Sequence, residues 1–463
     1  MNKEKELVKN AGIIAIGKIS SQIATFLLLP LYISILSASE FGIVDLILSY
    51  IQLLLPIVNL QLDQSLFRFL VNKRNDINEC STVISTIIFF SFVQVVIYVI
   101  LFLILQLFIS SSLKWFFLLN TICLIYSSLM ANCARGLGKN LNYSVQSFVA
   151  VLFNILFNIT FLVFLKFGVS GMLLASALSS LFAGTYGLVL VKPYLFFSLS
   201  SVNTKKIKEF YSFSIPLIPN QLSWWVMNAS DKTVINLFVS LTANGIIAVA
   251  SKFSSAYILV FNLFNLAWTE SVVLHINDDD GKIYLEKIIN KVFLLFSAVC
   301  FGIISFMPFV FRLFVPNVEY AEVYNLIPIF LVSSLCNVVV GLYSAIYVAN
   351  KDTKAVASTS GIAAGINLLV DLSLVRLIGI YAAPISTFTG FAVAMVYRYF
   401  HSRKYIDVRI ENRILFFTIL IGFIIVFLYY INNTMTNLLS VFLCVSYAIT
   451  ILFRYFQNFA IIK

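Results

Sequence analysis

The chain consists of long apolar segments separated by short polar ones. Each apolar segment has about 20 residues or more, the length that an α-helix needs to cross the hydrocarbon core of a bilayer. Backbone groups in lipid must be satisfied within the spanning structure, so segments of this length predict helices rather than barrel strands. The expected helices, about fourteen in number, cover residues 11–35, 41–65, 82–108, 114–134, 143–166, 170–191, 211–239, 244–270, 288–313, 321–348, 355–376, 379–400, 413–432 and 438–456.

The composition agrees with a chain that lies in a membrane. Hydrophobic residues make up 60% of the sequence and charged residues 11%, whereas a soluble protein is about 25% charged. The six cysteines are scattered and form neither a CxxC pair nor a Cys/His cluster, so we expect no disulfide framework, no metal site and no cofactor. The two histidines, His275 and His401, fall in expected cytoplasmic loops.

The basic residues predict the orientation. Most of the 31 Lys and Arg residues lie on the membrane side that holds residues 1–10, and only Lys114, Lys166, Arg312 and Arg376 lie on the other side. Cytoplasmic loops carry the excess of Lys and Arg, so we expect both termini inside. The same asymmetry accounts for most of the formal net charge of +11, and we expect no binding to nucleic acid.

The chain also resembles itself at a spacing of about 205–213 residues, as do transporters built from internal repeats. Residues 36–43 (LSASEFGI) resemble residues 241–246 (LTANGI), and each stretch opens the second helix of a block of six. Two polar pairs also correspond, and members of each pair are four residues apart, so that each pair lies on one helical face. These pairs are Asn154 with Asn158, and Asn367 with Asp371.

These patterns predict an all-α polytopic membrane protein with two parallel-repeat lobes of six helices around a central cavity. We expect the N-lobe at residues 1–200, the C-lobe at 201–405 and a peripheral helix pair at 406–463. Six is an even number, so both lobes have the same orientation in the membrane. Transporters of this plan hold their substrate between the two halves.

Charged residues within the expected helices are the candidate functional residues, because an ionisable group at mid-bilayer costs at least about 2.5–3.5 kcal/mol. Lys18 lies in a polar stretch of the first helix, where it either faces a wet cavity or extends its amine to the inner surface. Arg68 lies at an inner helix end, as a group at the cavity mouth or as an ordinary interfacial charge.

The expected helix 211–239 is the most polar of the series. Pro216 and Pro219 interrupt its backbone hydrogen bonds near the inner end. Asp231 and the neighbouring Lys232 point about 100° apart on a helix, so that they cannot face the same cavity together. Lys252, at a similar depth, is a candidate partner for Asp231, and a polar clamp between helices is the structural alternative.

The sign of the buried charges favours an anionic substrate. Few acidic residues lie at depth, namely Asp45, Asp231 and Asp371. Lys and Arg neutralise a diphosphate through charge-assisted hydrogen bonds, whereas an exporter of cations would need more carboxylates and fewer lysines.

Several stretches resemble the Wzx-type O-antigen and polysaccharide flippases of the MOP superfamily, which also contains the MATE exporters and the MurJ lipid II flippases. The resemblance covers most of helices 1–12. Its motifs are Pro30-Leu-Tyr, Ser37-Ala-Ser-Glu-Phe-Gly42, Arg68-Phe, Ala134-Arg135-Gly-Leu-Gly138-Lys139-Asn140, Ile215-Pro-Leu-Ile-Pro219-Asn, Ser230-Asp231-Lys232, Asn244-Gly245-Ile and Ala267-Trp268-Thr-Glu270.

The resemblance implies a flippase for undecaprenyl-diphosphate-linked oligosaccharide, an O-antigen or capsule repeat unit, in the bacterial inner membrane. It would work by alternating access without covalent chemistry, and its partners would be the sugar lipid, the bilayer and polysaccharide polymerase machinery. Asp231 and Asp371 are the candidates for ion coupling or for orienting a lysine. The expected head-group contacts are the cations Lys18, Arg68, Arg135, Lys232 and Lys252.

Two other functions fit parts of the sequence. An ion-coupled MATE-like exporter of drugs or metabolites would share the helical pattern. A membrane enzyme such as a polymerase or acyltransferase is less well supported, because the outer loops are short and the two histidines give no catalytic constellation. We therefore expect a transporter rather than an enzyme.

Overall fold

The computed structural model describes residues 26–71, 73–108, 110–350 and 352–455, and every regular element in these ranges is helical. Eleven segments of the described chain are long and apolar enough to cross a membrane. One of them, Lys354–Lys404, contains two successive helices. The all-helical membrane fold predicted from the sequence is confirmed, and the number of fourteen crossings stays a prediction.

The chain divides into two compact units, Met1–Ala229 and Ser230–Lys463. The first unit contains α2 (Leu29–Ile35), α3 (Ala38–Val58), α4 (Leu62–Val71), α5 (Ile77–Leu105), α6 (Lys114–Gly136), α7 (Asn140–Asn158), α8 (Gly168–Val191) and α9 (Lys206–Ser214). The second contains α11 (Leu241–His275), α12 (Gly281–Phe314), α13 (Val323–Ala349), α14 (Thr353–Ile378), α15 (Ala382–His401), α16 (Asn412–Ile431) and α17 (Thr434–Tyr455). The boundary falls within α10 (Ile218–Phe238). The finer division at residues 200 and 405 stays a prediction.

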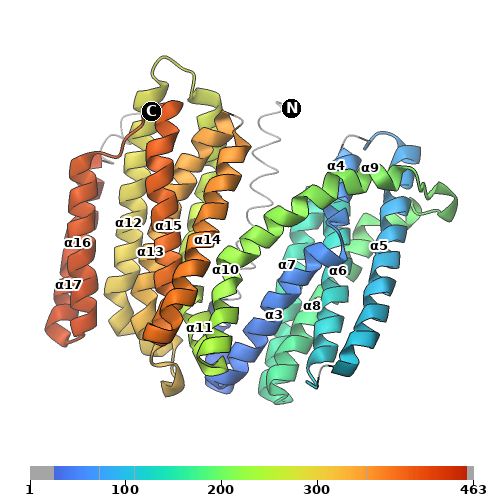
Figure 1. Cartoon of the computed structure of the whole chain (residues 1–463), viewed down its shortest axis with the longest axis horizontal. Coiled ribbons are helices and arrows are strands. Elements are labelled where there is room, and N and C mark those ends of the chain that lie inside the picture. Colours follow the sequence, from blue (N-terminus) through green and yellow to red (C-terminus); the bar gives the residue numbers. More distant parts are fainter. Residues whose placement is uncertain (1–25, 72, 109, 351, 456–463) are drawn as a thin grey trace. The chain divides into compact units, whose positions relative to one another are not determined.

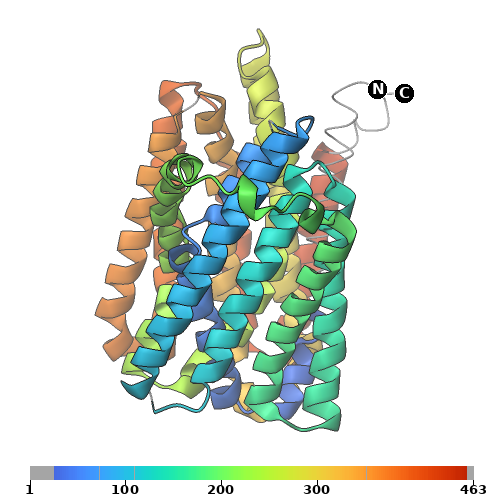
Figure 2. The same ribbon diagram turned by 90° about the vertical axis from the view of Figure 1, so that its right-hand side faces the viewer.

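The first unit is built around α6, which packs against α4 and α8, while α7 packs on α8. Figure 2 shows α5, α6 and α8 running alongside one another. Their buried faces meet in an apolar core that includes Leu66 of α4, Ile84 of α5 and Leu129 of α6. This core holds α4 against α6, so that Asp63 of α4 faces Ser128 and Asn132 of α6.

In the second unit, α13 is the central helix and packs against α11, α12 and α15, and α14 packs on α15 (Figure 1). Of the membrane-spanning part of α13, 78% is buried inside the protein. The helices α16 and α17 pack on each other and on α12. A helix that is hydrophobic on nearly all sides is typically buried, and α13 is mainly apolar with a few serines and asparagines.

One expected helix is in fact two. The segment 41–65 ends as α3 at Val58, and α4 begins at Leu62. Between them, Leu60 and Gln61 have φ angles of 46° and 56°, a left-handed conformation that non-glycine residues rarely adopt. The break contains the polar residues Asn59 and Gln61, but it is short and lies between mainly apolar stretches, so the hydrophobic pattern predicted one continuous helix. The break brings Asp63 into the interior of the first unit.

An expected loop is mostly helix. Residues 271–287 were predicted as an inner loop, but α11 continues to His275 and α12 begins at Gly281. With 35 and 34 residues, each helix is about 50 Å long and exceeds the hydrocarbon core of about 30 Å. The charged residues at these ends therefore mark where the helices leave the lipid, and not where they stop.

The motif at the start of each repeat forms a helix cap in both units. Ser37 and Glu40 form a reciprocal capping box at the start of α3, and the Ser240 hydroxyl accepts from the Ala243 N–H at the start of α11. Such caps satisfy backbone donors that have no partner within the helix. The predicted proline break also exists: Pro216 lies in a 3₁₀ turn, Ile215–Leu217, between α9 and α10.

Candidate functional site

Two buried carboxylates define a candidate site in the second unit. Asp231 on α10 is 7% exposed and Asp371 on α14 is 1% exposed. The two side chains lie close enough to interact electrostatically. The sequence predicted both as residues for ion coupling or for orienting a lysine, and the structure brings them into one cluster, whereas their roles stay a prediction.

Neutral polar side chains of α14 and α15 complete this cluster. The Thr387 hydroxyl lies 3.4 Å from Asp231 Oδ2. The Asn367 amide nitrogen lies 3.3 Å from Ser386 Oγ and 3.4 Å from Thr387 Oγ1. Asn367 lies one helical turn before Asp371 on α14. We call these residues the acidic cluster: Asp231, Asn367, Asp371, Ser386 and Thr387. Each of its members has at least one oxygen atom.

Four buried oxygen atoms of the acidic cluster accept no hydrogen bond within the described chain: Asp231 Oδ1, both carboxylate oxygens of Asp371, and Asn367 Oδ1. A buried polar atom without a partner is costly, and a buried charge without one is much more so. All four atoms are acceptors, so the chemistry that would satisfy them is a proton or a hard cation with oxygen ligands.

The first unit contains the same framework without the carboxylates. Asn158 occupies the repeat position of Asp371, and its amide donates to Asn154 Oδ1 at 3.1 Å. The Asn154 amide lies 3.4 Å from Ser179 Oγ on the next helix, α8. The predicted correspondence of the two polar pairs thus has matching contacts in three dimensions. Among these paired positions, only the second unit carries negative charge.

The basic residues predicted as head-group contacts are distributed over both units. In the first unit, Arg68 on α4 is exposed. The half-buried Arg135 at the end of α6 places its guanidinium 4.3 Å from the Phe67 ring and 5.3 Å from the Tyr143 ring. Stacking on two aromatic rings fixes the orientation of a guanidinium while its edge stays available for an anion.

In the second unit, Lys232 on α10 and Lys252 on α11 are both half-buried. The predicted contact between Lys252 and Asp231 stays a prediction. Lys18 lies outside the described residues. The head-group roles of these cations therefore remain hypotheses that rest on residue type and burial.

The sequence did not single out Asp63, which is 7% exposed on α4. Its carboxylate accepts from Asn59 at 3.1 Å, Gln64 at 3.0 Å, Ser128 at 2.8 Å and Asn132 at 3.0 Å. All four partners are neutral side-chain donors, and both carboxylate oxygens accept from them. The only signal in the sequence was an acidic residue near a helix end, which is ordinarily an interfacial charge.

Arg398 is the second charge whose environment the sequence did not reveal. It lies near the end of α15, where the charge pattern predicts an inner-surface residue, but it is 3% exposed. Its guanidinium donates to Thr359 at 2.8 and 3.0 Å and to Ser344 and the Val340 carbonyl. It thereby connects α13, α14 and α15 through neutral oxygens, as a structural residue.

Residues 7–269 match the model of a family described as polysaccharide biosynthesis protein. The chain belongs to this family. No curated protein matches it by sequence. In fold, it is similar to the lipid II flippase MurJ in an inward closed conformation, with a TM-score of 0.73 at 15% identity, over 96% of this chain and 99% of that one.

Two further solved structures share the fold. An inward-facing multidrug resistance MATE family transporter of the MOP superfamily gives a TM-score of 0.68 at 14% identity, over 84% of this chain and 97% of that one. A MOP superfamily transporter from Pyrococcus furiosus gives 0.59 at 14% identity, over 86% and 95%. The fold predicted from the resemblance to the MOP superfamily is confirmed. These identities are low, and the similarity is one of fold.

Proposed function

We propose that this polysaccharide biosynthesis protein is a flippase for undecaprenyl-diphosphate-linked oligosaccharide. It moves an O-antigen or capsule repeat unit from the cytoplasmic to the outer leaflet of the bacterial inner membrane by alternating access. The match to the polysaccharide biosynthesis family over residues 7–269 carries this proposal, and the MurJ-like fold supports it. Both termini are cytoplasmic in this proposal, as the distribution of Lys and Arg indicates.

The cations and the acidic cluster have separate roles in this proposal. Arg68, Arg135, Lys232 and Lys252 contact the diphosphate, with Lys18 as a further contact. Asp231 and Asp371 bind a proton or a hard monovalent cation, whose release on one side of the membrane drives the conformational cycle. Two neighbouring carboxylates in a low-dielectric interior repel each other strongly. Binding or release of a cation at the acidic cluster therefore changes the free energy enough to shift the equilibrium between the two conformations of the transport cycle.

The experiment compares a chromosomal deletion with variants expressed at the native level, and it measures surface polysaccharide and lipid-linked oligosaccharide. Deletion of the gene is expected to abolish surface polysaccharide and to cause lipid-linked oligosaccharide to accumulate. Asp371→Asn should reduce export at least tenfold, because it removes a charge from the coupling site. Asp279→Asn is the matched control, since Asp279 is an exposed residue of the α11–α12 turn, and it should export normally.

Unchanged polysaccharide in the deletion strain would overturn the proposed substrate. The second candidate function, an ion-coupled exporter of drugs or metabolites, is favoured by the fold shared with a MATE family transporter. It predicts a change in drug susceptibility with normal polysaccharide. If polysaccharide is lost on deletion but Asp371→Asn exports normally, the flippase assignment stands and the coupling role of the acidic cluster is wrong.

A further inference from the structure

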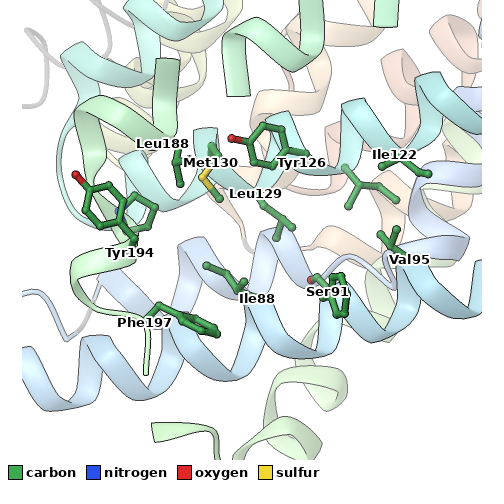
Figure 3. A pocket seen from close by; sticks show the side chains of 13 residues that line it. Ile88, Ser91, Val95, Ile122, Tyr126, Leu129, Met130, Leu188, Tyr194 and Phe197 are labelled. Carbon is green, nitrogen blue, oxygen red and sulfur yellow. The ribbon is translucent and has the colours of Figure 1, made fainter. Parts of the chain in front are cut away.

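An apolar groove lies within the first unit, between α5 and α6. Its volume is about 360 Å³, within the range of sites for small hydrophobic ligands. Figure 3 shows Ile88, Ser91 and Val95 of α5 facing Ile122, Leu129 and Met130 of α6 across it. All of these residues belong to one compact unit, and none is a predicted head-group contact.

The groove extends along the helices. It is lined on α5 from Ile88 to Val95 and on α6 from Ile122 to Met130, which corresponds to about 10–12 Å at 1.5 Å per residue. Both helices are candidate membrane spans, so this direction follows the membrane normal. A hydrocarbon chain that enters from the membrane surface has the same direction and the same apolar surface.

The segment 192–203, which we call the strap, borders one end of the groove. Pro193, Tyr194 and Phe197 of the strap line the groove (Figure 3). The strap crosses α5, as Figure 2 shows in green over blue. Hydroxyl groups of α5 fix its backbone, since Ser81 Oγ donates to the Phe196 carbonyl at 2.6 Å and the Ser198 N–H donates to Ser85 Oγ at 2.9 Å.

The strap has the properties of a segment at the membrane surface. It follows the spanning helix α8, and its side chains Tyr194, Leu195 and Leu199 are 53%, 70% and 69% exposed. Large apolar side chains next to polar backbone are favourable where headgroups meet acyl chains. The groove therefore opens at the depth where a phospholipid changes from headgroup to hydrocarbon.

Two exposed lysines lie next to residues at the strap end of the groove. Lys192 immediately precedes the groove-lining Pro193, and Lys139 Nζ donates to the Val191 carbonyl at 3.0 Å. Both lysines are exposed, and no carboxylate of the described chain forms an ion pair with either. By contrast, Lys206 forms an ion pair with Glu79 at 2.8 Å, and Glu79 also pairs with Lys73 at 3.3 Å. The groove entrance thus has a net positive charge.

We propose that this groove binds an acyl chain of an anionic phospholipid, whose phosphate contacts Lys192 and Lys139. The apolar lining selects hydrocarbon, the orientation of the groove selects a chain parallel to the helices, and the two ammonium groups select a negative headgroup over a zwitterionic one. In the proposed orientation, the site faces the cytoplasmic leaflet. The site itself is independent of the substrate proposed above.

The test measures lipid binding to the delipidated, purified protein by native mass spectrometry. The probes are phosphatidylglycerol, phosphatidylcholine of the same chains, and undecaprenyl phosphate. We expect phosphatidylglycerol to bind at least tenfold more tightly than phosphatidylcholine. The double variant Lys139→Gln/Lys192→Gln should weaken phosphatidylglycerol about 20-fold, whereas Lys114→Gln/Lys166→Gln, with the same charge change at the opposite end of α6 and α8, should not.

A second pair of variants tests the groove itself. Val95→Trp fills the groove and should reduce binding of phosphatidylglycerol at least tenfold. Val96→Trp adds the same ring at the next position, which is 40% exposed and does not line the groove, and should bind normally. Equal binding of both phospholipids, equal effects of the two tryptophans, or preferential binding of undecaprenyl phosphate would each overturn the proposal.

Discussion

Replacing Asp63 by asparagine removes one negative charge from the interior of the first unit and leaves the shape of the side chain almost unchanged. In the native protein, Oδ1 accepts from Asn59, and Oδ2 accepts from Gln64, Ser128 and Asn132. An asparagine can accept on one side only, and its amide group on the other side meets a donor. The variant therefore tests whether the charge itself holds α4 against α6.

The contacts give the size of the effect. A neutral hydrogen bond between membrane helices contributes about 0.6 kcal/mol, and ionisation of one partner roughly doubles that. Three bonds that become neutral therefore lose about 2 kcal/mol in total. The remaining donor loses its acceptor, at a further cost of about 1 kcal/mol. We expect Asp63→Asn to destabilise the protein by about 3 kcal/mol, which lowers the melting midpoint by about 6–12 °C for a unit of this size.

The cysteines provide the assay. All six are reduced and buried, and Cys80 and Cys133 belong to the same apolar core as α4 and α6. A thiol-reactive fluorescent dye will therefore report thermal unfolding of the purified protein directly. Asp279→Asn, at an exposed turn position, is the control and should shift the midpoint by less than about 2 °C. If Asp63→Asn melts as the control does, the carboxylate charge does not stabilise this network.

Two further outcomes follow from the structure. A Cβ at Gly184 would lie 2.5 Å from the Tyr126 ring. Gly184→Ala should therefore lower the free energy of unfolding by about 2 kcal/mol and the melting midpoint by about 4–8 °C. The control Gly361→Ala, with open space around it, should leave the midpoint unchanged. The Tyr405 hydroxyl, with other donors, lowers the pKa of Asp352 at the start of α14 from 3.8 to about 2. Because the pKa of Asp352 is depressed, its ionised form stabilises the folded start of α14 above about pH 4, and this stabilisation is lost as the pH falls through about 2. Hydrogen exchange at the start of α14 should show this transition. Tyr405→Phe should move the transition to higher pH.

The hydrophobic pattern predicted most helices, because the bilayer imposes a minimum length on each apolar segment. It also predicted the polar pair Asn367 and Asp371 on one face of α14, since positions four apart share a face in any helix. From the sequence, Asp231 and Asp371 could be named as buried carboxylates, but their proximity could not be predicted. That α10 and α14 bring Asp231 and Asp371 into one cluster depends on packing between helices that are more than a hundred residues apart in the chain.

The sequence by itself determined what the surrounding lipid dictates, namely helical structure and the membrane environment, and it contains the related motifs that begin α3 and α11. Tertiary structure decided which charges are buried and what they contact. Asp63 and Arg398 have the local sequence of interfacial residues, yet neighbouring helices supply four donors to one and several oxygen acceptors to the other. Burial and hydrogen bonding are properties of helix pairs, and the periodicity of a single helix contains no information about its partner.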